Sequence, residues 1–178
     1  MELIKVRIQK LSLIELAWII LSTTFIILIP IISHVLALPV YKLNPMHWII
    51  YLYCLSNKRS VNSIVLISIL MPIASVLFTG HPELAKGLIM ILEMYIYGLV
   101  FFAFNKSTHF DLFRAFIISQ VSGKTVYYLC KLLFLRFGWL AGPLFSRSLL
   151  SQSLVTLMIG TMLIVVYSIN RRKYLTQF

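Results

Sequence analysis

The chain has 178 residues, enough for one domain; 60% of them are hydrophobic and only 12% are charged. This composition excludes an ordinary water-soluble fold and predicts an all-α polytopic membrane protein, with residues 1–178 forming a single transmembrane domain. The formal net charge of +11 would favour nucleic-acid binding in a soluble protein. Here the basic residues lie mainly in short segments between apolar runs, where they set membrane orientation, so we expect no nucleic-acid partner.

The first apolar run predicts a helix over about residues 12–38. It is too long for the hydrophobic region of a cleaved signal peptide and ends in no A-x-A cleavage site. Ser12 and Glu15 fit a capping box, in which each side chain satisfies a backbone N–H of the first turn. Pro30 predicts a kink or break, which would leave His34 on a short segment near the opposite membrane face.

The second and third helices are expected over about residues 45–56 and 61–78. Asn44 and Pro45 predict the cap and first turn of the second helix. Its 12 residues would extend about 18 Å, so this helix cannot cross a membrane of ~30 Å alone. A kink is expected at Pro72 of the third helix.

The fourth helix, expected over about residues 83–104, carries a carboxylate near the middle of a membrane-length apolar run. Lys86, Met90, Glu93 and Tyr97 recur at steps of four, three and four, so they share one face. A charge at the centre of a bilayer costs ~3 kcal/mol on insertion scales, so this face should avoid lipid. We therefore interpret Glu93 as the floor of a binding site.

A second polar stripe lies on the fifth helix, expected over about residues 112–137. Its members recur at helical spacing: Gln120, Lys124, Tyr127 or Tyr128, and Lys131. A sixth helix is expected over about residues 149–170, followed by a basic tail. Cytoplasmic termini would place ten of the 16 basic residues on the cytoplasmic side, which supports six segments and both ends inside.

Glu93 and Lys124 are expected to lie at similar depth, about 15–18 Å from the starts of two antiparallel helices. A pair between them is the natural way to carry opposite charges into a low dielectric. Two interpretations stay open: a structural ion pair, or a pair that also contacts a ligand. Tyr97 and Tyr127 beside it offer ring surface and hydroxyls suited to a flat heterocyclic solute.

The histidines His34, His47 and His81 map to the outer ends of the first, second and fourth helices. Their spacing matches no metal-ligand pattern, so we expect them to line or structure the mouth of a pocket, without a metal. The sequence also lacks hydrolase, zinc-protease and Walker motifs. We therefore expect no enzyme activity and no cofactor, and active transport would need a partner that hydrolyses ATP.

Five segments together resemble the substrate-binding S component of energy-coupling factor (ECF) transporters, the six-helix membrane subunits that capture vitamins and related micronutrients in prokaryotes. They are Pro30 to His34, Asn44 to His47, Pro72 to Pro82, the Glu93-x-x-x-Tyr97-Gly98 pattern, and Gly123 to Tyr127. The resemblance implies a six-helix transmembrane bundle of this type in the prokaryotic cell (inner) membrane, surrounded by lipid. It also implies an outward-facing pocket for a small micronutrient and docking onto a transmembrane coupling subunit that is bound to two ATPase subunits.

Two departures and one rival interpretation accompany the resemblance. The Ala-x-x-x-Ala patch common on the first helix of S components is absent, because Ala17 is followed four residues later by Leu21. Docking would then use Ser22, Ser63 or other small residues, or a different partner. Lys124 also stands where the resemblance leads us to expect arginine.

The rival interpretation is a non-transporting membrane scaffold of the MreD-like cell-shape type. The charge of the solute is open, because Glu93 would favour a cation and Lys124 an anion.

Overall fold

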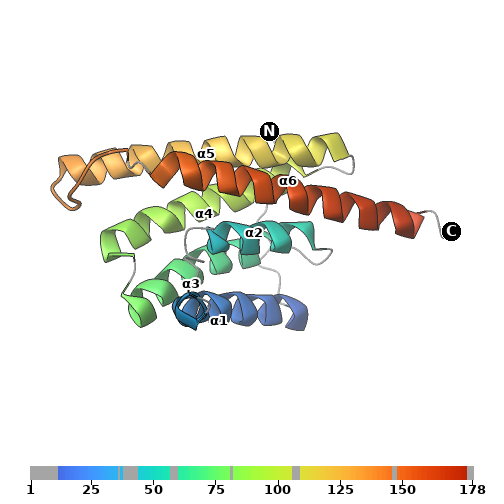
Figure 1. The fold of residues 1–178 in the computed structure, drawn as a ribbon, viewed down its shortest axis with the longest axis horizontal. Helices are drawn as coiled ribbons and strands as arrows, with labels where there is room; N and C mark the ends of the chain where they lie inside the picture. The colour runs from blue at the N-terminus through green and yellow to red at the C-terminus, as the bar shows by residue number, and fades with distance from the viewer. Residues whose placement is uncertain are drawn as a thin grey trace, which may run out of the picture.

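The computed structural model describes residues 12–35, 37, 44–56, 60–80, 82–105, 109–145 and 148–175. Every regular element in these ranges is a helix (Figure 1). The six helices are α1 (Leu13–Val35), α2 (Pro45–Leu55), α3 (Val61–Thr79), α4 (Leu84–Phe104), α5 (His109–Arg136) and α6 (Ser148–Leu175). The predicted all-helical fold is therefore confirmed for the part of the chain that the structure describes.

Most helix boundaries differ from the sequence prediction by three residues or fewer, but α6 continues to Leu175, past the expected end near residue 170. Basic residues near the end of a helix interact favourably with its dipole, so the basic tail did not have to end the helix. Neither proline interrupts its helix: Pro30 lies inside the continuous helix α1, and Pro72 lies inside the continuous helix α3.

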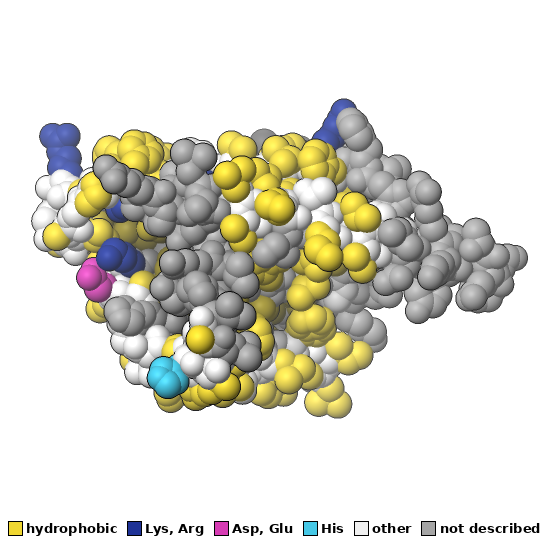
Figure 2. Space-filling model, viewed as in Figure 1, with side chains coloured by type: hydrophobic (Ala, Val, Ile, Leu, Met, Phe, Trp, Pro, Cys, Tyr) yellow, Lys and Arg dark blue, Asp and Glu magenta, His cyan; other side chains and the backbone are white. Residues whose placement is uncertain are grey.

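Three helices, α1, α3 and α4, are long and apolar enough to cross a membrane. On α1, residues such as Ile19, Ile26 and Ile29 are buried, while Leu21 and Ile31 on other faces are more than half exposed. Hydrophobic side chains also cover much of the face in Figure 2, and the charged side chains in that view lie toward the ends of the helices. Such a surface suits lipid better than water, so the structure is compatible with a membrane-embedded helical protein.

The short helix α2 lies at the centre of the bundle and contacts α1, α3, α4 and α6 (Figure 1). Tyr53 and Cys54 are fully buried, and Ile50 and Tyr51 nearly so. A helix that is apolar on all sides is typical of a position inside a larger fold. This placement matters for function because it carries the side chains of α2 toward α4 and α5.

Helices α4 and α5 form the most extensive helix pair and run antiparallel. Glycine allows this close approach. A Cβ atom at Gly123 of α5 would lie 3.2 Å from the ring of Tyr97 and 3.4 Å from the carbonyl oxygen of Glu93. The α4 backbone at Glu93 therefore packs directly against α5 beside Lys124.

Candidate functional site

Glu93 and Lys124 form the predicted ion pair between α4 and α5. The Lys124 Nζ atom lies 2.6 Å from Glu93 Oε1. The Glu93 side chain is only 3% exposed, whereas that of Lys124 is 22% exposed. The carboxylate is thus the inner member of the pair, and the Lys124 side chain is its more accessible member.

His47 completes this charged cluster, contrary to the expectation that it lies at a pocket mouth. Its Nε2 atom is 3.2 Å from the same Glu93 Oε1, and the residue is 4% exposed. The prediction assigned His47 to an outer helix end, but α2 enters the bundle so centrally that its first turn already lies in the core. One buried carboxylate oxygen therefore contacts two basic groups.

Tyr97 and Gln120 extend the polar cluster toward the start of α5. Gln120 Nε2 donates a hydrogen bond of 2.8 Å to the Tyr97 hydroxyl. The Tyr97 ring packs edge-on against His47, with the ring centroids 4.9 Å apart. These contacts link both predicted residues to the charged cluster, although their role in binding stays a prediction.

Tyr51 is a member of this region that the sequence analysis did not single out. The centroid of its ring lies 4.4 Å from that of the Tyr97 ring and 4.9 Å from that of the Phe116 ring. Its hydroxyl oxygen is 3.1 Å from Ser119 Oγ. The signal was present, because Tyr51 follows His47 by four residues and so shares its face of α2.

Tyr127 flanks the other side of Lys124. The Lys124 Nζ atom lies 5.4 Å from the centroid of the Tyr127 ring, within the range of a cation–π contact. Tyr127 packs edge-on against Tyr128, at 5.3 Å between centroids. The accessible member of the ion pair is therefore bordered by aromatic surface.

Other predicted residues lie elsewhere or outside the described ranges. His34 is exposed in the last turn of α1, and no contact of the described residues joins it to Glu93. His81 lies outside the described residues. Lys86 pairs with Glu83, one turn earlier along the chain, at 3.3 Å.

Asn44 and Pro45 are the N-cap and the first residue of α2, as predicted. Asn44 adopts a left-handed backbone conformation with φ of 52°, and its side chain makes no capping hydrogen bond. Its Nδ2 atom instead donates to Thr156 Oγ1 at 3.0 Å and so connects the start of α2 to α6.

A second buried carboxylate lies at the start of α1. The predicted capping box is present, because the Ser12 backbone N–H donates to Glu15 Oε2 at 2.8 Å. Glu15 also accepts hydrogen bonds from Ser63 Oγ at 3.2 Å and from the Tyr53 hydroxyl at 3.4 Å. The side chain thus ties together α1, α2 and α3, a role beyond capping.

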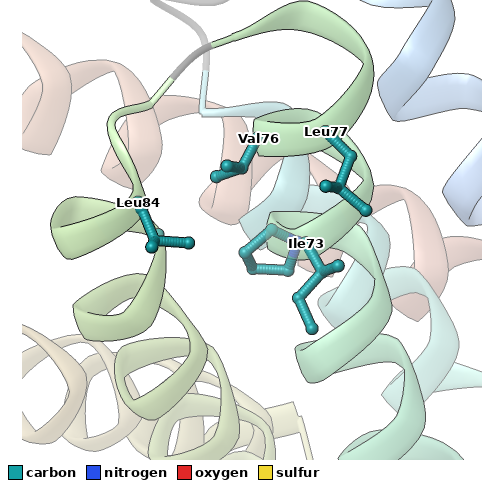
Figure 3. Close-up of a pocket in the computed structure, with 6 residues that line it drawn as sticks. Ile73, Val76, Leu77 and Leu84 are labelled. Atoms are coloured by element: carbon teal, nitrogen blue, oxygen red, sulfur yellow. The ribbon is translucent and has the colours of Figure 1, made fainter.

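An apolar pocket of about 60 Å³ lies between α3 and α4 (Figure 3). It is lined by Pro72, Ile73, Val76, Leu77, Leu84 and Gly87. None of the predicted site residues borders it. It offers hydrocarbon surface alone and none of the ionic or hydrogen-bonding groups that surround Glu93.

The cluster around Glu93 combines a carboxylate, an ammonium group, an imidazole, a carboxamide and phenols. These groups can form hydrogen bonds and ionic contacts with a polar molecule. Among the described residues, no three His, Cys, Asp or Glu side chains lie close enough to hold a metal ion.

The fold and this cluster define a helical protein compatible with membrane embedding that buries charge in its interior. Comparisons with protein-family models, curated proteins and solved structures find no match for this chain.

Proposed function

We propose that the protein is the substrate-binding membrane subunit of an ECF-type ABC importer. It would capture a vitamin or related micronutrient from outside the cell for ATP-driven uptake. The observation that carries this proposal is the buried cluster of Glu93, His47 and Lys124, in which the lysine stays partly accessible beside an aromatic ring. Intramembrane ionisable groups are costly, and they commonly mark a ligand or ion pathway.

The partners would be a transmembrane coupling subunit and two ATPase subunits. Ser22 and Ser63 are only 3% and 0% exposed, so these small residues are not available for docking. The exposed apolar face of α1, which includes Leu21 and Ile31, is the better candidate for this contact. Six segments in the prokaryotic cell membrane, with both termini in the cytoplasm, belong to the same proposal, which the positions of the basic residues support.

Uptake reconstituted in liposomes tests this function. The protein would be inserted alone and together with the coupling and ATPase subunits of its host, with ATP inside and a pool of labelled micronutrients outside. We expect accumulation only when all subunits and ATP are present. Accumulation by the protein alone, without ATP or an ion gradient, would refute the proposal. Equal accumulation by coupling complexes that lack the protein would refute it as well.

One observation favours the second candidate, a non-transporting scaffold of the MreD-like type. Glu93 is almost fully enclosed and already contacts two basic groups, as a purely structural ion pair would. A scaffold predicts that removing the pair changes stability or partner assembly but no solute affinity. The double variant Glu93→Gln/Lys124→Met distinguishes the two candidates, because it removes both charges together and leaves neither unpaired.

A further inference from the structure

Lys131, two turns after Lys124 on α5, is a buried cation with little compensation. The residue is 8% exposed, and its Nζ atom donates a hydrogen bond of 2.8 Å to the carbonyl oxygen of Leu144. An ammonium group has three donors. Among the described residues, no carboxylate lies within ion-pair distance of Lys131, as the ion pairs there are those of Glu93 and Glu83.

The carboxylates nearest along α4 are already occupied. Glu93 contacts Lys124 and His47, and Glu83 contacts Lys86. Lys86 also acts electrostatically on Lys131 as a like charge. From Glu83 to Lys131, this part of α4 and α5 therefore carries more described lysines than carboxylates, and an anion placed here would reduce the imbalance.

Aromatic rings border the same position. Residues 124, 128 and 131 follow the i, i+4, i+7 spacing of one helix face. The Tyr128 ring packs against Phe145, 5.0 Å between centroids, in the segment that also supplies the Leu144 carbonyl. The segment that follows α5 thus folds back against this face and places flat apolar surface beside the Lys131 ammonium group.

We infer that the captured solute is an aromatic anion whose carboxylate or phosphate group is received by Lys131 together with Lys124. Its ring system would lie against Tyr128 and Phe145. The anion would take donors of Lys131 that the Leu144 carbonyl leaves unused, and Glu93 would hold Lys124 in position. This inference rests on the proposed function for its site, and it decides the charge of the solute that the sequence left open.

Matched two-ring probes test the inference: 2-naphthoate, 2-naphthyl phosphate and 2-naphthylmethylamine. Each would be titrated by calorimetry into the protein in lipid nanodiscs, with empty nanodiscs as the control for partition into lipid. We expect at least one anion to bind about tenfold or more tighter than the amine, because a charge-assisted hydrogen bond is worth that much. Equal or tighter binding of the amine, or no binding of any probe up to about 10 mM, would overturn the inference.

Two single-charge variants on α5 then locate the anion. Lys131→Gln should weaken binding of the preferred anion about tenfold, because a neutral amide replaces the ammonium group. Arg136→Gln removes the same charge from an exposed position on another face of α5 and should leave affinity unchanged within about twofold. Equal affinities of wild type and Lys131→Gln would refute the assignment. If Lys131→Gln does not fold, the probe preference of the wild type decides the outcome.

Failure of this inference is distinguishable from failure of the proposed function. Subunit-dependent uptake of a cationic or neutral solute would refute the anion and leave the importer subunit standing. Anion binding through Lys131 without subunit-dependent uptake would support the anion site and refute the importer subunit.

Discussion

The ion pair between Glu93 and Lys124 gives the sharpest energetic prediction. The two charged atoms are 2.6 Å apart, and His47 approaches the same carboxylate oxygen at 3.2 Å. Lys124→Met removes one of the two basic groups that contact the buried Glu93 carboxylate and leaves His47 as the other. Breaking a buried pair costs 3–5 kcal/mol, and because His47 remains we expect the lower end, ~3 kcal/mol.

Glu93→Gln should cost less, ~2 kcal/mol, because Lys124 is partly accessible and the amide oxygen can still accept a hydrogen bond. The double variant should cost clearly less than the sum, with a coupling free energy of roughly 1–3 kcal/mol. Unfolding of wild type, both single variants and the double variant in mixed detergent micelles, followed by circular dichroism, measures the cycle. Additive costs, with coupling below ~0.5 kcal/mol, would refute the buried-pair reasoning.

Three further predictions concern the cluster, the helix packing and the topology. His47→Leu should destabilise the protein by ~1–3 kcal/mol in the same assay, because Glu93 loses a buried polar contact, and an unchanged midpoint would contradict that contact. Gly98→Ala should cost ~1–3 kcal/mol, because the new Cβ would lie 2.6 Å from Ile64 Cγ2, and a neutral result would mean that α3 and α4 are packed less closely. Reporter fusions at the C-terminus and within residues 138–147 should report opposite sides of the membrane, cytoplasmic for the C-terminus, and the same side for both would refute the six-segment topology.

The sequence predicted the helices and the central ion pair because both depend on local regularity. Apolar runs of membrane length predicted the helices. Helical spacing placed Glu93 and Tyr97 on one face of α4, and it placed Gln120 and Lys124 on one face of α5. The same spacing placed Lys86 on the face of Glu93, and in the structure Lys86 forms an ion pair with Glu83. A lysine near the start of a helix can pair with a carboxylate one turn away, and spacing alone cannot separate that case from an inward-facing lysine.

The residues that sequence reasoning misplaced depend on contacts between distant segments. His47 was assigned to a helix end, but the position of that end in the core follows from how α2 packs among four other helices. Glu15 was recognised through its capping box, whereas its contacts with Tyr53 and Ser63 join three helices that no local pattern relates. The mostly apolar sequence of α2 was a sign that its few polar side chains would be buried.

Identification of small molecules that co-purify with the protein tests the central claim most directly. Wild type, Arg136→Gln and Glu93→Gln/Lys124→Met would be purified in parallel from the same cells, and their extracts compared by mass spectrometry. We predict that one solute co-purifies in nearly equal amounts with wild type and Arg136→Gln. The same solute should be absent from the folded double variant. The absence of any specific solute from wild type, or equal occupancy in all three proteins, would contradict a solute site built on Glu93 and Lys124.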